Sequence, residues 1–207
     1  MFRMVFDVES IGLFGEGFAV GYVVIDGTGA EVANGMYACN PQNAVGSDSS
    51  RIWVRDNVPA LPYNCIDPKS MRDMFWRDFV FWKGKTCELW ADCAWPVEAG
   101  FLIACINDDL ESREWGGPYP LYEIASLLNA CGHSPLEPID RLKSEFPVHH
   151  PVADARQSAR ILHNAMICLK SGDSAQLETS LYKFSPHHAG VWTNEQAPAQ
   201  PAETEVA

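Results

Sequence analysis

The sequence predicts an α/β fold with a mixed sheet. Three apolar segments of strand length come first, and from residue 68 onward segments with helical periodicity alternate with short strand-like segments. This order is typical of a sheet that is covered by helices. A chain of 207 residues has the length of one domain and can bury a sizeable core. We therefore expect a single domain over residues 1–193.

The first three strands are expected to form an antiparallel meander. Residues 2–8 carry the apolar run MVF, and the turn-like sequence GLFGEG follows. Residues 18–26, FAVGYVVID, are apolar almost throughout, which favours burial on both faces of a sheet. DGTG then predicts a turn, and residues 31–40 supply the third strand.

A long connection separates the meander from the first expected helix. Residues 41–68 are rich in Pro, Asn, Ser and Asp, and we expect a functional loop there. Asp67 followed by Pro68 is a typical helix start, and residues 68–84 place apolar side chains at helical spacing. Residues 87–95, CELWADCAW, are expected to form a strand.

The C-terminal half is expected to alternate between helix and strand. Pro96 stands at a first helical position, and VEAGFLIACINDDL continues that helix. Residues 119–132 predict a short strand and then a helix that ends at Gly132, and residues 152–170 form a strongly amphipathic helix. The polar, Pro-rich residues 194–207 are expected to be a disordered tail.

The composition limits the classes of partner. Lys and Arg number 15 against 27 Asp and Glu, and this formal charge of −12 argues against broad, non-specific binding to a phosphate backbone. A small nucleic-acid site stays open, because bound metal ions can supply local positive charge. No apolar run reaches membrane-spanning length and the N-terminus lacks the order of a signal peptide, so no membrane partner is expected. Seven cysteines without a CxxC pair indicate reduced thiols of a cytoplasmic protein.

Acidic residues mark three places where expected elements begin or end. Asp7 and Glu9 lie two apart on the first strand, so their side chains share one face, where burying two carboxylates is costly. His149 precedes Asp154 by five positions at the entry to the last helix, and Glu98 stands at the start of another helix. Taken singly, each acid has an ordinary explanation as a solvated strand end or as a first-turn residue favoured by the helix dipole.

Taken together, the three places resemble the motifs of the DEDDh family of 3′–5′ exonucleases, in a small bacterial or phage exoribonuclease-like branch. FDVES is similar to the first motif, and HHPVADARQSA is similar to the third, with His149 and Asp154 in the family's positions. The resemblance covers residues 2–170 and implies a ribonuclease H-like mixed sheet with flanking helices. The second motif departs from the family, because Glu98 in WPVEAGFL stands where the family has Asp. Asp92 is the alternative ligand, and the spacing favours Glu98.

The resemblance implies a role for each motif residue. Asp7 would bridge two divalent cations, Mg²⁺ or Mn²⁺, and Glu9 would hold the cation on the side of the nucleophile. The remaining ligands would be Glu98 and Asp154. His149 would act as the general base on the attacking water.

Other residues are candidates for the base and for substrate contacts. His150 competes with His149 for the role of base, at a spacing one residue shorter than the family pattern. Side chains that would bind substrate through aromatic stacking or phosphate contact are Phe14, Phe18, Trp95 and Arg156. The alternatives are a core position for the phenylalanines and a surface ion pair for the arginine.

The expected function is therefore hydrolysis of phosphodiester bonds from the 3′ end of single-stranded nucleic acid, with RNA slightly favoured over DNA. Sparse basic residues favour short strands over a long duplex. One alternative is a catalytically impaired nucleic-acid-binding protein on the same fold, and the other is a two-metal nucleotide phosphohydrolase. We consider a homodimer as an alternative to a monomer.

Overall fold

The strands and helices of the computed structural model follow the predicted order, with additions in the long connection. The structure describes residues 1–171, 177 and 181, so the predicted tail from residue 194 lies outside the described residues. The strands are β1 (Phe2–Ser10), β2 (Gly17–Ile25), β3 (Glu31–Ala38), β4 (Cys87–Ala91) and β5 (Tyr122–Glu123). The α-helices are α1 (Asp48–Asn57), α2 (Pro68–Lys83), α3 (Ala99–Asn107), α4 (Leu110–Arg113), α5 (Ile124–Ala130) and α6 (Pro151–Ser171). Shorter helical turns are η1 (Pro41–Asn43), η2 (Ala94–Glu98) and η3 (Lys143–Glu145).

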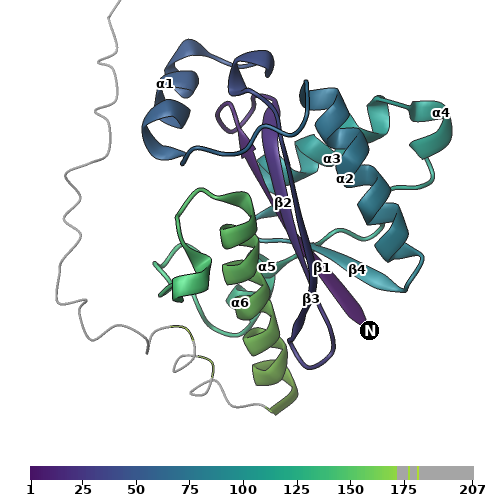
Figure 1. The fold of residues 1–207 in the computed structure, drawn as a ribbon. Coiled ribbons are helices and arrows are strands. Elements are labelled where there is room, and N and C mark those ends of the chain that lie inside the picture. Colours follow the sequence, from purple (N-terminus) through teal and green to yellow (C-terminus); the bar gives the residue numbers. More distant parts are fainter. Residues whose placement is uncertain (172–176, 178–180, 182–207) are drawn as a thin grey trace, which may run out of the picture.

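The five strands form one sheet in the order β3-β2-β1-β4-β5. β1, β2 and β3 pair antiparallel, as the predicted meander requires, whereas β4 is parallel to β1 and β5 is parallel to β4. Figure 1 shows α6 on one side of this sheet, α2 and α3 on the other, and α1 beyond one end. This mixed sheet with flanking helices confirms the predicted fold class and is consistent with a ribonuclease H-like arrangement.

The central strand β1 divides its side chains between the two faces of the sheet. Met4, Phe6 and Val8 point to the face that α2 and α3 cover, because side chains alternate along a strand. The ring of Phe6 lies 5.4 Å from that of Phe75 on α2 and 6.5 Å from that of Phe101 on α3, measured between centroids. This close packing fixes α2 and α3 against β1, so the start of α3 is held beside the end of the strand.

The opposite face of the sheet is covered by α5 and α6. Val5, Val23 and Trp90 pack there against apolar residues of the two helices, among them Leu128 and Leu162. β2 is buried along its whole length, as its apolar sequence predicts. Among the described residues, no helix has both the length and the apolar character needed to cross a membrane.

Helix α1 corrects the prediction of a loop over residues 41–68. The side chain of Ser47 caps the helix by accepting a hydrogen bond from the amide of Ser50, and Asp48 places negative charge in the first turn. Val54 is buried in a third apolar cluster with Phe18 and Leu61. The Ser- and Asp-rich stretch is therefore a helix start rather than a loop signal.

The region around Asp92 also differs from the prediction. β4 ends at Ala91 instead of continuing to residue 95, and the chain turns through η2 into α3. Trp95 interrupts that turn with an extended backbone, φ −107° and ψ 136°. Asp92 thus follows the end of the strand, and Glu98 ends η2 immediately before α3.

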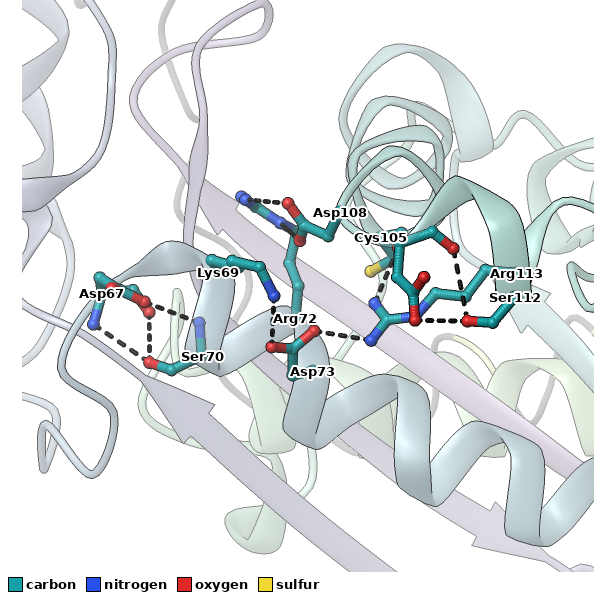
Figure 2. A network of polar contacts seen from close by, with 10 residues as sticks. Asp67, Lys69, Ser70, Arg72, Asp73, Cys105, Asp108, Ser112 and Arg113 are labelled. Carbon is teal, nitrogen blue, oxygen red and sulfur yellow. Dashed lines mark hydrogen bonds and ion pairs between the residues drawn. The ribbon is translucent and has the colours of Figure 1, made fainter.

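A polar network fastens α2 to its neighbours (Figure 2). Asp67 and Ser70 form a capping box at the start of α2, where Asp67 and Pro68 predict a helix start. The buried guanidinium of Arg72 donates to both carboxylate oxygens of Asp108, at 2.6 and 3.0 Å, and to Glu16 at 2.7 Å. Arg72 therefore connects the end of α3 to the loop that follows β1.

Candidate metal centre

The first two carboxylates of the centre extend from β1 toward α6. Asp7 and Glu9 lie on the same face of the strand as Val5, and in the sheet they are paired with Gly21 and Ala19 of β2. Glu9 is buried and Asp7 is partly buried. Their partners on β2 therefore have small or absent side chains on this face of the sheet.

Gly21 allows α6 to approach this face closely. A Cβ atom at Gly21 would lie 2.4 Å from the carbonyl carbon of Pro151 and 2.4 Å from the amide nitrogen of Val152. Both contacts are with backbone that cannot move aside as a flexible side chain would. The glycine opposite Asp7 therefore lets the first turn of α6, which carries Asp154, lie over the carboxylates of β1.

The third predicted motif folds around Asp154. One carboxylate oxygen of Asp154, Oδ2, accepts a hydrogen bond of 3.0 Å from the backbone amide of His149. This bond accompanies a left-handed backbone at His149, with φ +59°. Donor atoms of Glu9, His149 and Asp154 lie within 4.8 Å of one another, close enough to share one metal ion. The structure thus brings together residues from β1 and from the start of α6, as the motif predicts.

The two adjacent histidines have different surroundings. The Nδ1 atom of His150 accepts a hydrogen bond from the amide of Ala153, at 3.4 Å, and so caps the N-terminus of α6. The ring of His149 packs edge-on against that of Trp53 on α1, with 5.0 Å between centroids. His149 is therefore the histidine whose ring nitrogen lies with Glu9 and Asp154, whereas His150 caps the N-terminus of α6.

Glu98 and Asp92 both approach the same carboxylates. Glu98 is buried, and the backbone of Val8, between the two acids of β1, acts on its carboxyl group by lowering its pKa against the effect of burial. Asp92 is more exposed and stands at the end of β4, near Asp154. Glu98 thus lies against β1 and Asp92 at the end of β4, and the group of ligand atoms formed by Glu9, His149 and Asp154 includes neither of them.

Burial, together with electrostatic repulsion, raises the pKa of Asp7, Glu9 and Glu98 in this cluster. Burial, followed by the charges of Glu9, Asp154, Glu98 and Asp92, raises the pKa of Asp7 well above its usual value. Burial and the neighbouring carboxylates raise the pKa of Glu9 to about 8, and burial raises that of Glu98 to about 7. Acids with raised pKa values gathered in one place mark a candidate functional site, and a bound cation would lower those pKa values.

The raised pKa values predict that the metal-free protein loses stability as pH rises. Between about 4.5 and 8 the folded state holds the proton of Glu9 while the unfolded state has released it, so the free energy of unfolding falls through this window. Melting temperatures measured in a chelator from pH 5 to 8.5 should decline, and Glu9→Gln should flatten the decline. A melting temperature that rises across this range in the wild type would contradict the raised pKa of Glu9 in the folded state.

A second prediction concerns Gly21. The variant Gly21→Ala should push the start of α6 away from β1 and lower both the melting temperature and the stabilisation by Mn²⁺, because the added methyl group meets backbone at 2.4 Å. Gly27→Ala is the matched control, since a Cβ there has no neighbour within 4 Å. Equal effects of the two variants in a thermal-shift measurement would show that Gly21 has no special part in placing α6.

The residues predicted to bind substrate differ in their exposure and contacts. Phe14 is 84% exposed in the loop after β1, and Trp95 is 68% exposed just before Glu98, so both rings can meet a ligand. Phe18 is only 1% exposed and packs in the third apolar cluster, so it is a core residue and presents no ring face to a base. Arg156 forms a bidentate ion pair with Glu31 on β3, at 2.9 and 3.0 Å. This is the surface ion pair that was the alternative to a phosphate contact.

Two residues beside the centre were not predicted from the sequence. Trp53 lies in a segment expected to be a loop, and only the amphipathic pattern of α1 could have placed its ring. Arg141 forms an ion pair of 2.5 Å with Asp154, from a segment without any motif. Both contacts depend on how distant segments pack, which local sequence patterns do not report.

Comparisons with known proteins add no family to this description. No protein-family model matches the chain, and no curated protein matches it at a significant level. Any function proposed for this protein therefore depends on the geometry of the centre itself.

Proposed function

We propose that this protein is a metal-dependent 3′–5′ exonuclease that hydrolyses phosphodiester bonds of single-stranded nucleic acid. The observation that carries the proposal is the grouping of Glu9, His149 and Asp154, whose ligand atoms lie within 4.8 Å of one another, in the electrostatic field of Asp7 and Glu98. Such a set of carboxylates with one histidine suits phosphodiester hydrolysis better than a structural role, because like charges buried together destabilise a fold. We place the activity in the cytoplasm because the seven cysteines include no CxxC pair and are all free thiols.

The donor set fits two hard divalent cations, Mg²⁺ or Mn²⁺. Carboxylate oxygens are the ligands that these ions prefer, and four carboxylates are available in Asp7, Glu9, Glu98 and Asp154. Cations bound there would supply the charge that activates water and stabilises the leaving oxygen. The same charge would relieve the repulsion that raises the pKa of the acids of β1.

His149 is the proposed general base. Its side chain lies beside Glu9 and Asp154, and the bond from its backbone amide to Asp154 fixes its position relative to those carboxylates. A histidine takes a proton readily near neutral pH, which suits removal of a proton from an attacking water. The ring of Trp53 also contacts the imidazole, with the two ring planes at 77°.

The surroundings favour a single-stranded substrate with its bases exposed. Aromatic side chains with solvent-accessible faces lie next to the centre or near its motifs, namely Trp53, Phe14 and Trp95. Stacking on such rings is tolerant of sequence and needs unpaired bases. With a net charge of −12, a short strand is the expected substrate, and RNA is slightly preferred to DNA in the proposal.

A digestion of 5′-labelled single-stranded RNA and DNA tests the proposal. Products that shorten stepwise from the 3′ end, with Mn²⁺ or Mg²⁺ and not with a chelator, are the expected result. Hydrolysis of free nucleotides without shortening of the strands would instead identify a nucleotide phosphohydrolase. Binding of the strands without cleavage would identify a protein that has lost catalysis.

The roles of Glu98 and Asp92 can be separated by matched amide variants. Glu98→Gln should reduce turnover by about 10²-fold or more, the size of effect found when one electrostatic stabiliser of an active site is removed. Asp92→Asn should keep measurable activity at high Mn²⁺, because Asp92 is at the margin of the cluster. The opposite ranking in a steady-state assay would move the ligand to Asp92.

A further inference from the structure

The carboxylate of Asp154 already has a cation of the protein beside it. The guanidinium Nη1 of Arg141 lies 2.5 Å from Oδ1 of Asp154, and the side chains of both residues are mostly buried. The other oxygen, Oδ2, accepts from the amide of His149. Each oxygen of this proposed metal ligand therefore has a donor from the protein, and the donor on Oδ1 carries a positive charge.

The backbone around Arg141 is fastened to α6. The guanidinium of Arg160 bonds both carboxylate oxygens of the buried Glu145, at 2.6 and 2.9 Å, and the carbonyl of Asp140 at 2.6 Å. Glu145 in turn accepts from the amide of Leu142 at 2.9 Å. These bonds hold the residues on both sides of Arg141 against α6 and so position its side chain beside Asp154.

Arg141 also acts on the other side of the cluster. Its charge lowers the pKa of Asp92, against the effects of burial and of Asp154. The same Nη1 donates to the carbonyl of Glu145 at 2.8 Å, so the guanidinium keeps one hydrogen-bond partner when it leaves Asp154. One of the two hydrogen bonds of Nη1 is therefore kept when the ion pair with Asp154 is broken.

We propose that Arg141 is an internal competitor for the metal centre, which occupies Asp154 in the metal-free protein and sets the metal concentration at which the centre loads. The inference rests on the proposed function, since it takes Asp154 as a metal ligand. A positive charge 2.5 Å from a ligand oxygen opposes the binding of a divalent cation there. Loading the centre then requires that the ion pair with Arg141 be given up, which weakens the apparent affinity for metal.

Calorimetric titration of Mn²⁺ into the substrate-free protein tests the proposal. Arg141→Gln removes the charge and should bind Mn²⁺ more tightly by about tenfold or more, a change that needs only a modest interaction energy. Arg141→Lys keeps a positive charge and should stay closer to the wild type. Arg77→Gln is the control for net charge, because Arg77 pairs with Asp78 on α2, across the sheet from the centre.

The outcomes separate this inference from the proposed function. If the wild type binds no Mn²⁺, both are wrong. If the wild type binds Mn²⁺ and Arg141→Gln binds it equally or more weakly, only the role of Arg141 is overturned. If Arg141→Gln then binds an oligonucleotide more weakly while its affinity for Mn²⁺ is unchanged, Arg141 is a substrate contact instead. Should Arg141→Gln fail to fold, a crystal structure of the wild type with Mn²⁺ decides: the Nη1–Oδ1 contact is expected to be broken, and an intact contact overturns the proposal.

Discussion

Asp7→Asn is expected to abolish the response of the protein to metal and to stabilise its metal-free form. Asp7 is surrounded by the charges of Glu9, Asp154, Glu98 and Asp92, so a neutral amide removes repulsion at the middle of the cluster. In the wild type, Mn²⁺ at about 100 times its dissociation constant should stabilise by about 2.7 kcal/mol. For a domain of this size that corresponds to a rise in melting temperature of about 5–10 °C.

The same variant should lose turnover by about 10²–10³-fold or more, because a cation that stabilises developing charge is no longer held. Glu111→Gln is the control, since Glu111 is exposed on α4. Thermal-shift curves with and without Mn²⁺, run beside the digestion assay, measure both effects. A Mn²⁺ shift in Asp7→Asn equal to that of the wild type would remove Asp7 from the ligand set.

His149→Ala is expected to lower turnover by about 10²–10⁴-fold, the usual contribution of general acid–base catalysis. Affinity for an oligonucleotide should change little, and the melting temperature of the metal-free protein should also hold, because the bond from residue 149 to Asp154 is made by the backbone amide. The effect should therefore fall on kcat rather than on KM.

His150→Ala provides the comparison, since the two histidines are adjacent in sequence and differ in contacts. Loss of His150 removes the cap on the amide of Ala153 and should lower the melting temperature slightly with little effect on kcat. If kcat falls more in His150→Ala than in His149→Ala, the roles of the two residues are reversed.

The fold was largely predictable because its signals are local. The continuous apolar run of β2 predicts a strand that is buried on both faces, and Asp67 with Pro68 predicts the start of α2, both of which the structure confirms. Helix α1 was missed because Ser47 and the polar residues after it favour caps and loops alike. What distinguishes the two is the burial of Val54, which depends on distant residues of the chain.

The candidate site was predictable where chemistry and spacing coincide. Two acids on one face of β1, and a histidine five residues before an acid, could be read directly, and the structure brings Glu9, His149 and Asp154 of these together. The contributions of Gly21 and Arg141 could not be read in this way. Gly21 matters because the backbone of α6 passes over it, and Arg141 because a segment without a motif folds back on Asp154.

Anomalous diffraction from crystals grown with Mn²⁺ tests the central claim most directly, because it locates the metal ions without reference to activity. We expect two peaks among the carboxylates of Asp7, Glu9, Glu98 and Asp154, and the loss of at least one peak in Asp7→Asn. Crystals of the wild type with saturating Mn²⁺ but no peak between β1 and the start of α6 would contradict it.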